Sequence, residues 1–130
     1  PDEHIVLPEI ISKEPLGPMV RLGDDEWFSV VKWTYYALLT AEEMGITKAN
    51  LDDTAAKTQN PDVKRFLGKD GSYGADIGLT NAWAAQIVKH MGNYGELFEK
   101  NVGASSPLKI ARGVNALWTK GGLQYAPPVR

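Results

Sequence analysis

The chain has 130 residues, of which 43% are hydrophobic and 23% are charged, with a formal net charge of −2 and no cysteine. This length and composition are typical of one globular domain and exclude a disordered tail. The small net charge gives no positive field for nucleic acid, so we expect no nucleic-acid partner. Without cysteine, the sequence excludes disulfides, thiolate metal ligands and a cysteine nucleophile.

Short runs of β-branched and alternating residues near the amino terminus predict two or three short strands. The first runs lie in residues 4–12, where Pro8 confines a strand to an edge or a break. The next lies in residues 15–22, where Leu16 and Val20 fall on the same face. Two strands so close together cannot form a stable sheet alone. The pattern therefore predicts that the chain is incomplete, or that it exchanges elements with a second copy.

The firmest predicted element is a helix that begins after Asp24. Apolar residues recur at steps of three and four between Trp27 and Met44, which is the helical period. Asp24 is a good N-cap, and the two acidic residues after it suit the first turn. Gly45 follows the pattern as a C′ glycine, so we expect the helix to end there.

Weaker helical patterns follow, each marked by a capping residue or by apolar spacing. We expect helices over 48–57 after a Thr47 cap, from Asn60-Pro61 to Leu67, from a Thr80 cap to Met91, and over 94–102 until Gly103. The glycine-rich residues 68–74 predict a loop. The tail predicts at most one short helical stretch around 112–118.

The chain offers no pattern of catalytic or metal-ligating residues. The only histidines, His4 and His90, each lack a second histidine or cysteine at ligand spacing. The adjacent carboxylates at 24–26, 42–43 and 52–53 point in different directions on a helix, which disfavours a general acid–base pair. The glycines of 68–78 are not preceded by a strand, so they do not predict a phosphate loop. We therefore assign no catalytic residue, no metal ligand and no cofactor.

Aromatic and arginine side chains are the remaining candidates for a binding role. Rings on or beside helical apolar stripes predict core positions, and these are Trp27, Trp33, Trp83, Tyr94 and Phe98. Three rings lie in irregular chain: Trp118 and Tyr125, expected to pin the tail against the domain, and Tyr73.

Two arginines, Arg21 and Arg112, could each clamp a ligand carboxylate through a bidentate pair of bonds. Both could equally form structural ion pairs with nearby acids. The structural interpretation is the one we favour for both.

Several segments resemble one bacterial family closely. They are residues 8–21 (PEIISKEPLGPMVR), 23–28 (GDDEWF), 92–101 (GNYGELFEKN) and the tail 107–130 (PLKIARGVNALWTKGGLQYAPPVR). Together they resemble the carboxy-terminal part of general L-amino-acid-binding periplasmic proteins, the receptors of ABC importers for polar amino acids. Those receptors are more than twice as long as this chain, and the chain begins at Pro1 without an initiator Met or signal peptide. We therefore expect a truncated or processed product.

The resemblance implies an α/β fold of the type II periplasmic-binding-protein kind, of which this chain is a mostly helical carboxy-terminal fragment. Residues 1–14 would be the end of the second lobe and the hinge. Residues 15–103 would form the carboxy-terminal part of the first lobe. Residues 104–130 would be an extension typical of the general amino-acid branch.

The same resemblance implies a periplasmic receptor, not an enzyme, which delivers L-amino acids to the membrane permease of an ABC importer. The residues that hold ligand are upstream in the family, so none is assigned here. The apolar surface would be covered by the missing upstream portion or by a second copy of the chain. Two alternatives stay open: a periplasmic enzyme of the same fold resembling cyclohexadienyl dehydratase, and a sensor or interaction module.

Overall fold

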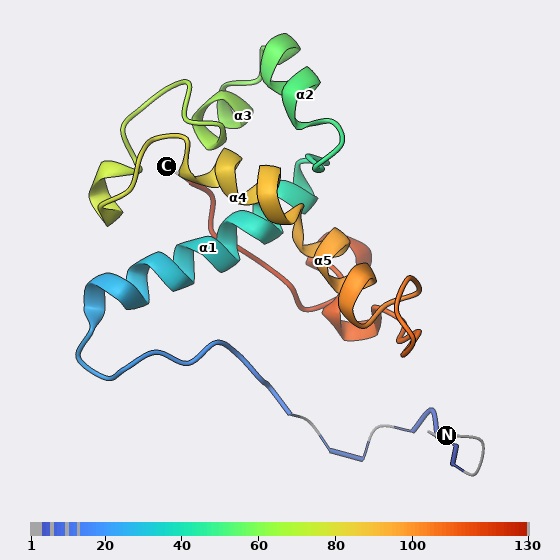
Figure 1. Cartoon of the computed structure of the whole chain (residues 1–130). Coiled ribbons are helices and arrows are strands. Elements are labelled where there is room, and N and C mark those ends of the chain that lie inside the picture. The colour runs from blue at the N-terminus through green and yellow to red at the C-terminus, as the bar shows by residue number, and fades with distance from the viewer. Residues whose placement is uncertain (1–3, 6, 10, 13, 130) are drawn as a thin grey trace.

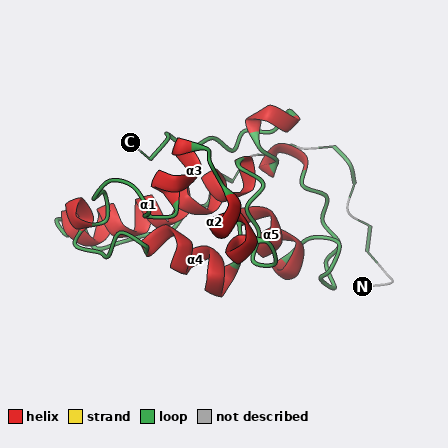
Figure 2. Cartoon of the chain, turned by 90° about the horizontal axis from the view of Figure 1, so that it is seen from above, coloured by secondary structure: helices red, strands yellow, loops and turns green. Residues whose placement is uncertain are grey.

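The computed structural model describes residues 4–5, 7–9, 11–12 and 14–129. Every regular element in this part of the chain is helical, as Figure 2 shows, apart from an isolated parallel bridge between Leu117 and Gln124. Figure 1 shows the helices packed around α1 while the chain before α1 runs outside them. The predicted mostly helical character is confirmed.

The first helix, α1, spans Asp25–Glu43 and forms the centre of the structure. Asp24 caps it, because its Oδ1 atom accepts a bond of 3.1 Å from the backbone N–H of Trp27. The chain leaves the helix through Gly45, whose φ of 68° is the left-handed conformation expected of a C′ glycine. Both predicted ends of this helix are therefore confirmed.

The second helix, α2, spans Leu51–Lys57 and begins three residues later than predicted. Thr47 does not cap it. Instead, the backbone N–H of Thr47 donates to Asn50 Oδ1 at 2.7 Å, and the N–H of Asn50 donates to Thr47 Oγ1 at 3.2 Å. These reciprocal bonds fix a turn in place of the first helical turn.

The third helix, α3, spans Pro61–Phe66 and begins as predicted. The Asn60 side chain accepts a bond of 2.9 Å from the N–H of Asp62. Beyond α3, a 3-10 helix, η1, spans Ala75–Ile77, within the chain that connects α3 to α4. The predicted loop over 68–74 contains no helix.

The fourth helix, α4, spans Trp83–Met91, so the predicted start at Thr80 is wrong. Residues 80–82 form a turn, because the N–H of Trp83 donates to the backbone carbonyl of Thr80 at 3.0 Å. The chain then bends at Gly92, as predicted, with a φ of 81°.

The fifth helix, α5, spans Tyr94–Asn101 and begins with a capping box. Asn93 Oδ1 accepts from the N–H of Glu96 at 2.9 Å, and Glu96 Oε2 accepts from the N–H of Asn93 at 2.8 Å. Asn93 Nδ2 also donates to the carbonyl of Ile46 at 2.9 Å. The cap therefore ties α5 to the chain that follows α1.

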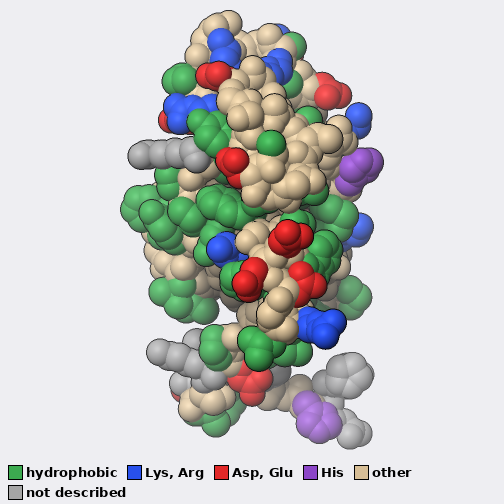
Figure 3. Space-filling view, turned by 90° about the vertical axis from the view of Figure 1, so that its left-hand side faces the viewer, with side chains coloured by type: hydrophobic (Ala, Val, Ile, Leu, Met, Phe, Trp, Pro, Cys, Tyr) green, Lys and Arg blue, Asp and Glu red, His purple; other side chains and the backbone are tan. Residues whose placement is uncertain are grey.

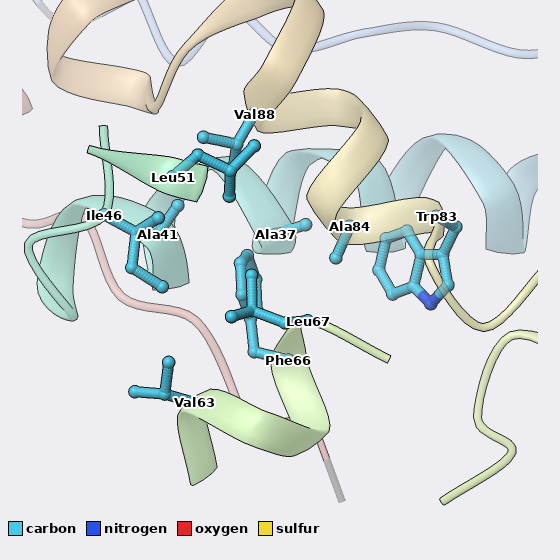
Figure 4. Close-up of a cluster of buried hydrophobic side chains, with 10 residues drawn as sticks. All are labelled: Ala37, Ala41, Ile46, Leu51, Val63, Phe66, Leu67, Trp83, Ala84 and Val88. Carbon is cyan, nitrogen blue, oxygen red and sulfur yellow. The ribbon is translucent and has the colours of Figure 1, made fainter. Parts of the chain in front are cut away.

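The main core lies where α1 packs against α4, under α2 and α3. Figure 4 shows the side chains converging from these helices and the connection after α1. Its fully or nearly buried members are Ala37, Ala41, Ile46, Leu51, Val63, Phe66, Leu67, Trp83, Ala84 and Val88.

The five predicted core rings divide into three groups. Trp33 and Tyr94 are partly buried and pack against buried apolar clusters. Trp83 and Phe98 are buried, which confirms the prediction for these two residues. Trp27 is 54% exposed, so its predicted core position is wrong in this structure. It lies on the first turn of α1, and Figure 1 shows that this end of the helix extends beyond α4 and α5.

The carboxy-terminal tail crosses α1 and ends near α3 and α4 (Figure 1). In place of the predicted helical stretch it forms two 3-10 helices, η2 (Gly113–Asn115) and η3 (Trp118–Lys120). A second buried cluster fixes the tail to α1. Its members are Leu39, Leu117 and Ala126, with Tyr35, Tyr36 and Tyr94 packed against them.

The predicted amino-terminal strands do not form in the described residues. Residues 14–20 have no assigned helix or strand, and their apolar side chains face solvent: Leu16 is 89% and Met19 96% exposed. A strand needs a neighbour to pair its backbone, and the described part of the chain supplies none. Val6 and Ile10, which also belong to the predicted strands, lie outside the described residues.

Candidate functional site

Arg112 forms a bidentate pair with Glu42, near the end of α1. Its Nη1 atom lies 3.1 Å from Glu42 Oε1, and its Nη2 atom lies 3.0 Å from Glu42 Oε2. The Glu42 side chain is only 8% exposed. This parallel arrangement is the strongest geometry that an arginine and a carboxylate can adopt.

Two further N–H donors of Arg112 are also occupied. Nε and Nη2 donate to the carbonyl of Asn115 at 3.3 and 3.0 Å. The guanidinium carbon lies 5.2 Å from the ring centroids of both Tyr94 and Phe98, which is cation–π distance. Arg112 is therefore a structural residue, and it has no free pair of parallel N–H donors for a ligand carboxylate.

Arg21 lies away from this cluster in the sequence and is exposed. It lines an open hollow at the start of α1 together with Asp24, Asp25 and Glu26. The structure therefore does not bring the two candidate arginines into one site.

A second polar contact between α1 and the tail joins Tyr35 to Gln124. The Tyr35 hydroxyl donates to Gln124 Oε1. Burial raises the pKa of Tyr35 above 10.0, and neighbouring Tyr94 and Tyr36 raise it further. Burial also raises the pKa of Tyr94, although the Arg112 charge opposes this effect. Both hydroxyls therefore stay protonated at neutral pH, and that of Tyr35 acts as a donor, not as a base.

Trp118 and Tyr125 were predicted to pin the tail, and the structure assigns that role chiefly to other residues. Trp118 is 51% exposed and Tyr125 is 60% exposed, with their rings 6.0 Å apart in an edge-to-face arrangement. Trp118 Nε1 does donate to Glu43 at 3.2 Å. The apolar anchors are Leu117 and Ala126, the neighbours of the two rings in the sequence.

No catalytic or metal centre emerges from the histidines and carboxylates of the described residues. His4 lies in the chain before α1, and His90 is exposed near the end of α4. Within the part of the chain that the structure describes, no three His, Cys, Asp or Glu side chains group closely enough to hold a metal ion. The same described residues contain no helix that is long and apolar enough to cross a membrane.

Comparisons with known proteins were made over the whole chain. No protein-family model matches it. It is 67% identical over 132 residues to the general L-amino acid-binding periplasmic protein AapJ of Rhizobium johnstonii, covering 100% of this chain and 38% of that protein. It is 59% identical to the glutamate/glutamine/aspartate/asparagine-binding protein BztA of Rhodobacter capsulatus, covering 97% of this chain and 37% of BztA.

A solved structure agrees with these relatives. The periplasmic binding protein of a Brucella ovis ABC transporter, solved with glutathione bound, superposes with a TM-score of 0.93 at 58% identity. The match covers 99% of this chain and 40% of that one.

Over its whole length the chain is thus similar to one part of periplasmic solute-binding proteins of ABC transporters. The resemblance and fold class predicted from the sequence are thereby confirmed.

This chain spans less than two fifths of the length of the curated relatives described above. The names of those relatives describe amino-acid-binding proteins, not enzymes, and AapJ is named as periplasmic. Sequence reasoning missed the Arg112–Glu42 pair as a connection between α1 and the tail, because no local pattern relates residues so distant in sequence.

Proposed function

We propose that this chain is the carboxy-terminal part of a periplasmic receptor that captures L-amino acids and delivers them to the permease of an ABC importer. The observation that carries the proposal is the 67% identity to a general L-amino acid-binding protein over the entire chain. The TM-score of 0.93 to a periplasmic binding protein supports it.

Within that receptor, we assign residues 1–14 to the end of the second lobe and the hinge, 15–103 to the first lobe and 104–130 to an extension. The packing of α1 against α4 and α5 supports a single unit for the middle region. The bonds from Arg112 and Gln124 to α1 support an extension that is fixed to that unit.

The missing upstream portion of the receptor would cover the segment before α1. Leu16, Met19 and Leu22 are each at least 89% exposed, and a run of apolar side chains in water is unfavourable. The structural match covers 99% of this chain but only 40% of the Brucella ovis protein, which therefore has further chain that could pair with such a segment. A conformation without internal contacts is most simply explained by contacts made elsewhere in the receptor.

Ligand would be held by residues upstream of this chain, and no residue here is assigned to it. A receptor of broad specificity gains most of its affinity from the α-ammonium and α-carboxylate, which every amino acid carries. Charge-assisted bonds to these groups contribute about 1.5–3 kcal/mol each. This chain contributes first-lobe packing and the hinge connection, which position those upstream residues, and it has no enzymatic activity.

Titration calorimetry on two proteins tests this function. The full-length receptor is expected to bind L-amino acids of several side-chain types, whereas residues 1–130 alone are expected to give no measurable heat of binding. Binding of comparable strength by the isolated chain would overturn the proposal. A full-length receptor that binds no L-amino acid would overturn it equally.

A further inference from the structure

A small aromatic recess lies between α1, the loop before α4 and the end of the tail. Its volume is about 90 Å³, and its lining comes from Trp33, Tyr73, Asp76, Ile77, Trp83 and Val129. Three of these six residues are aromatic and one is a carboxylate. The amino-acid receptor function proposed above makes no use of this recess.

The three rings are held by separate parts of the fold. Trp33 lies on α1, where its ring packs edge-on against Tyr36 with centroids 5.6 Å apart. Trp83 is the first residue of α4 and is buried. The Tyr73 ring lies against Gly71, whose φ is +80°, so closely that a Cβ there would be 2.3 Å from the ring. Because Gly71 has no side chain, the Tyr73 ring can occupy this position.

The loop that carries Asp76 is fixed by its own backbone bonds. The N–H of Ala75 donates to Ser72 at 3.0 Å, and the N–H of Leu79 donates to Gly74 at 2.8 Å. Asp76 itself is exposed within the 3-10 helix η1. In the described chain, no lysine, arginine or histidine forms a salt bridge with it.

The surroundings of the recess are acidic. A neighbouring hollow shares Asp76 and Ile77 with it and is also lined by Asp25 and Glu26, the first residues of α1. Figure 3, which views the molecule from this side, shows acidic side chains amid hydrophobic ones, with Lys or Arg side chains beside them. No described basic residue lines the recess or the hollow. Asp76 therefore places a carboxylate, which can attract a cation, at the recess.

We propose that this recess binds a small alkylated ammonium group, such as the trimethylammonium group of choline. Aromatic faces attract a cation through their quadrupole. An alkylated ammonium is hydrated less strongly than a bare ammonium, so it loses less hydration free energy when it enters an aromatic recess. The nearby carboxylates add charge complementarity. A dry cavity of ~150 Å³ in another protein admits benzene, so this smaller volume suits a group of only a few heavy atoms.

The test uses the full-length receptor, with the indole N–H signals of Trp33 and Trp83 followed by NMR during a titration with choline. Its neutral isostere 3,3-dimethyl-1-butanol, which replaces the charged nitrogen with carbon, is titrated in parallel. We expect saturable shifts of both indole signals with choline, and binding at least about tenfold weaker for the alcohol. Equal shifts with both compounds, or no saturable shift with choline, would overturn the proposal.

Three variants locate the site. Tyr73→Leu removes a ring of the recess and is expected to weaken choline binding about tenfold, whereas Tyr73→Phe keeps the ring and should retain it. Tyr125→Leu removes an exposed ring outside the recess and should leave binding unchanged. Unaltered binding in Tyr73→Leu, or its loss in Tyr125→Leu, would contradict the assignment to this recess. Binding that L-amino acids abolish by competition would place choline in the receptor's own ligand site and would also contradict it.

Discussion

The guanidinium of Arg112 meets the carboxylate of Glu42 through two parallel bonds of 3.1 and 3.0 Å, although 70 residues separate them in the sequence. This pair connects the tail to the end of α1. Both side chains are largely withdrawn from water, at 19% and 8% exposure. Loss of Glu42 would leave Arg112 without its carboxylate. Loss of Arg112 would leave Glu42 with only the exposed Lys120 ammonium, 3.8 Å from its Oε1 atom, as an opposite charge.

Replacing Arg112 with leucine is therefore expected to destabilise the chain by about 3 kcal/mol, because the Glu42 carboxylate loses its partner. The double variant Arg112→Leu with Glu42→Leu should recover much of that loss, since no unpaired charge remains. Lys57→Ala breaks an exposed pair with Asp53 and should cost less than about 0.5 kcal/mol. Urea unfolding measures all three, and an equal cost for Arg112→Leu and Lys57→Ala would contradict the interpretation.

Asn93→Ala removes both the cap of α5 and the bond to the Ile46 carbonyl. Asn93 is buried, so we expect a loss of about 2 kcal/mol in the free energy of unfolding. Asn101→Ala is the matched control, because the exposed Asn101 amide only donates back to the Leu97 carbonyl. Thermal and urea unfolding should show a clear loss for Asn93→Ala and a change within about 0.5 kcal/mol for Asn101→Ala.

Phe66→Ala is expected to cost about 3–5 kcal/mol, because Phe66 is 1% exposed at the centre of the main core. Phe66→Leu keeps most of the apolar volume and should cost less than half as much. Urea midpoints of the two variants provide the comparison. A similar decrease in the free energy of unfolding for both variants would contradict this explanation, because only Phe66→Ala leaves a large cavity.

The raised pKa of Tyr35 predicts that the chain loses stability at high pH. Because burial raises the pKa of Tyr35 above 10.0, the folded state keeps its proton at a pH where the unfolded state has lost it. The free energy of unfolding should therefore be constant with respect to this group below pH 10 and fall as the pH rises through the folded pKa. Urea unfolding between pH 7 and pH 11.5 tests this prediction.

Tyr35→Phe supplies the control for that pH dependence. At pH 7 it should lose about 1 kcal/mol, since the Gln124 amide oxygen loses its donor. Above pH 10 its stability should fall less steeply than that of the parent chain. A residual fall is expected, because burial raises the pKa of Tyr94 as well. Identical slopes for the two proteins would contradict a role for Tyr35.

The elements with local signals could be predicted from the sequence. Asp24 marks the start of α1 through a bond within one turn, and Gly92-Asn93 marks the start of α5 in the same way. The starts after Thr47 and Thr80 were predicted wrongly, because both residues can cap a helix and here stabilise turns instead. Capping chemistry alone does not distinguish these two outcomes.

The contacts between distant segments could not be predicted. Nothing in the spacing of the tail relates Arg112 to Glu42, or Gln124 to Tyr35, because each pair depends on where the tail crosses α1. Leu117 anchors the tail, although its larger neighbour Trp118 gave the stronger signal in the sequence. The amino-terminal strands carry a real alternating pattern, but pairing depends on chain that the described residues do not contain.

Hydrogen–deuterium exchange over residues 14–22 tests most directly whether this chain is one part of a larger receptor. Leu16 and Leu22, which are 89% and 99% exposed here, should lie in a segment that exchanges freely in residues 1–130 alone. In the full-length receptor the backbone N–H groups of the same residues, which the prolines lack, should exchange at least about a hundredfold more slowly. Rapid exchange of this segment in the full-length receptor would contradict the account.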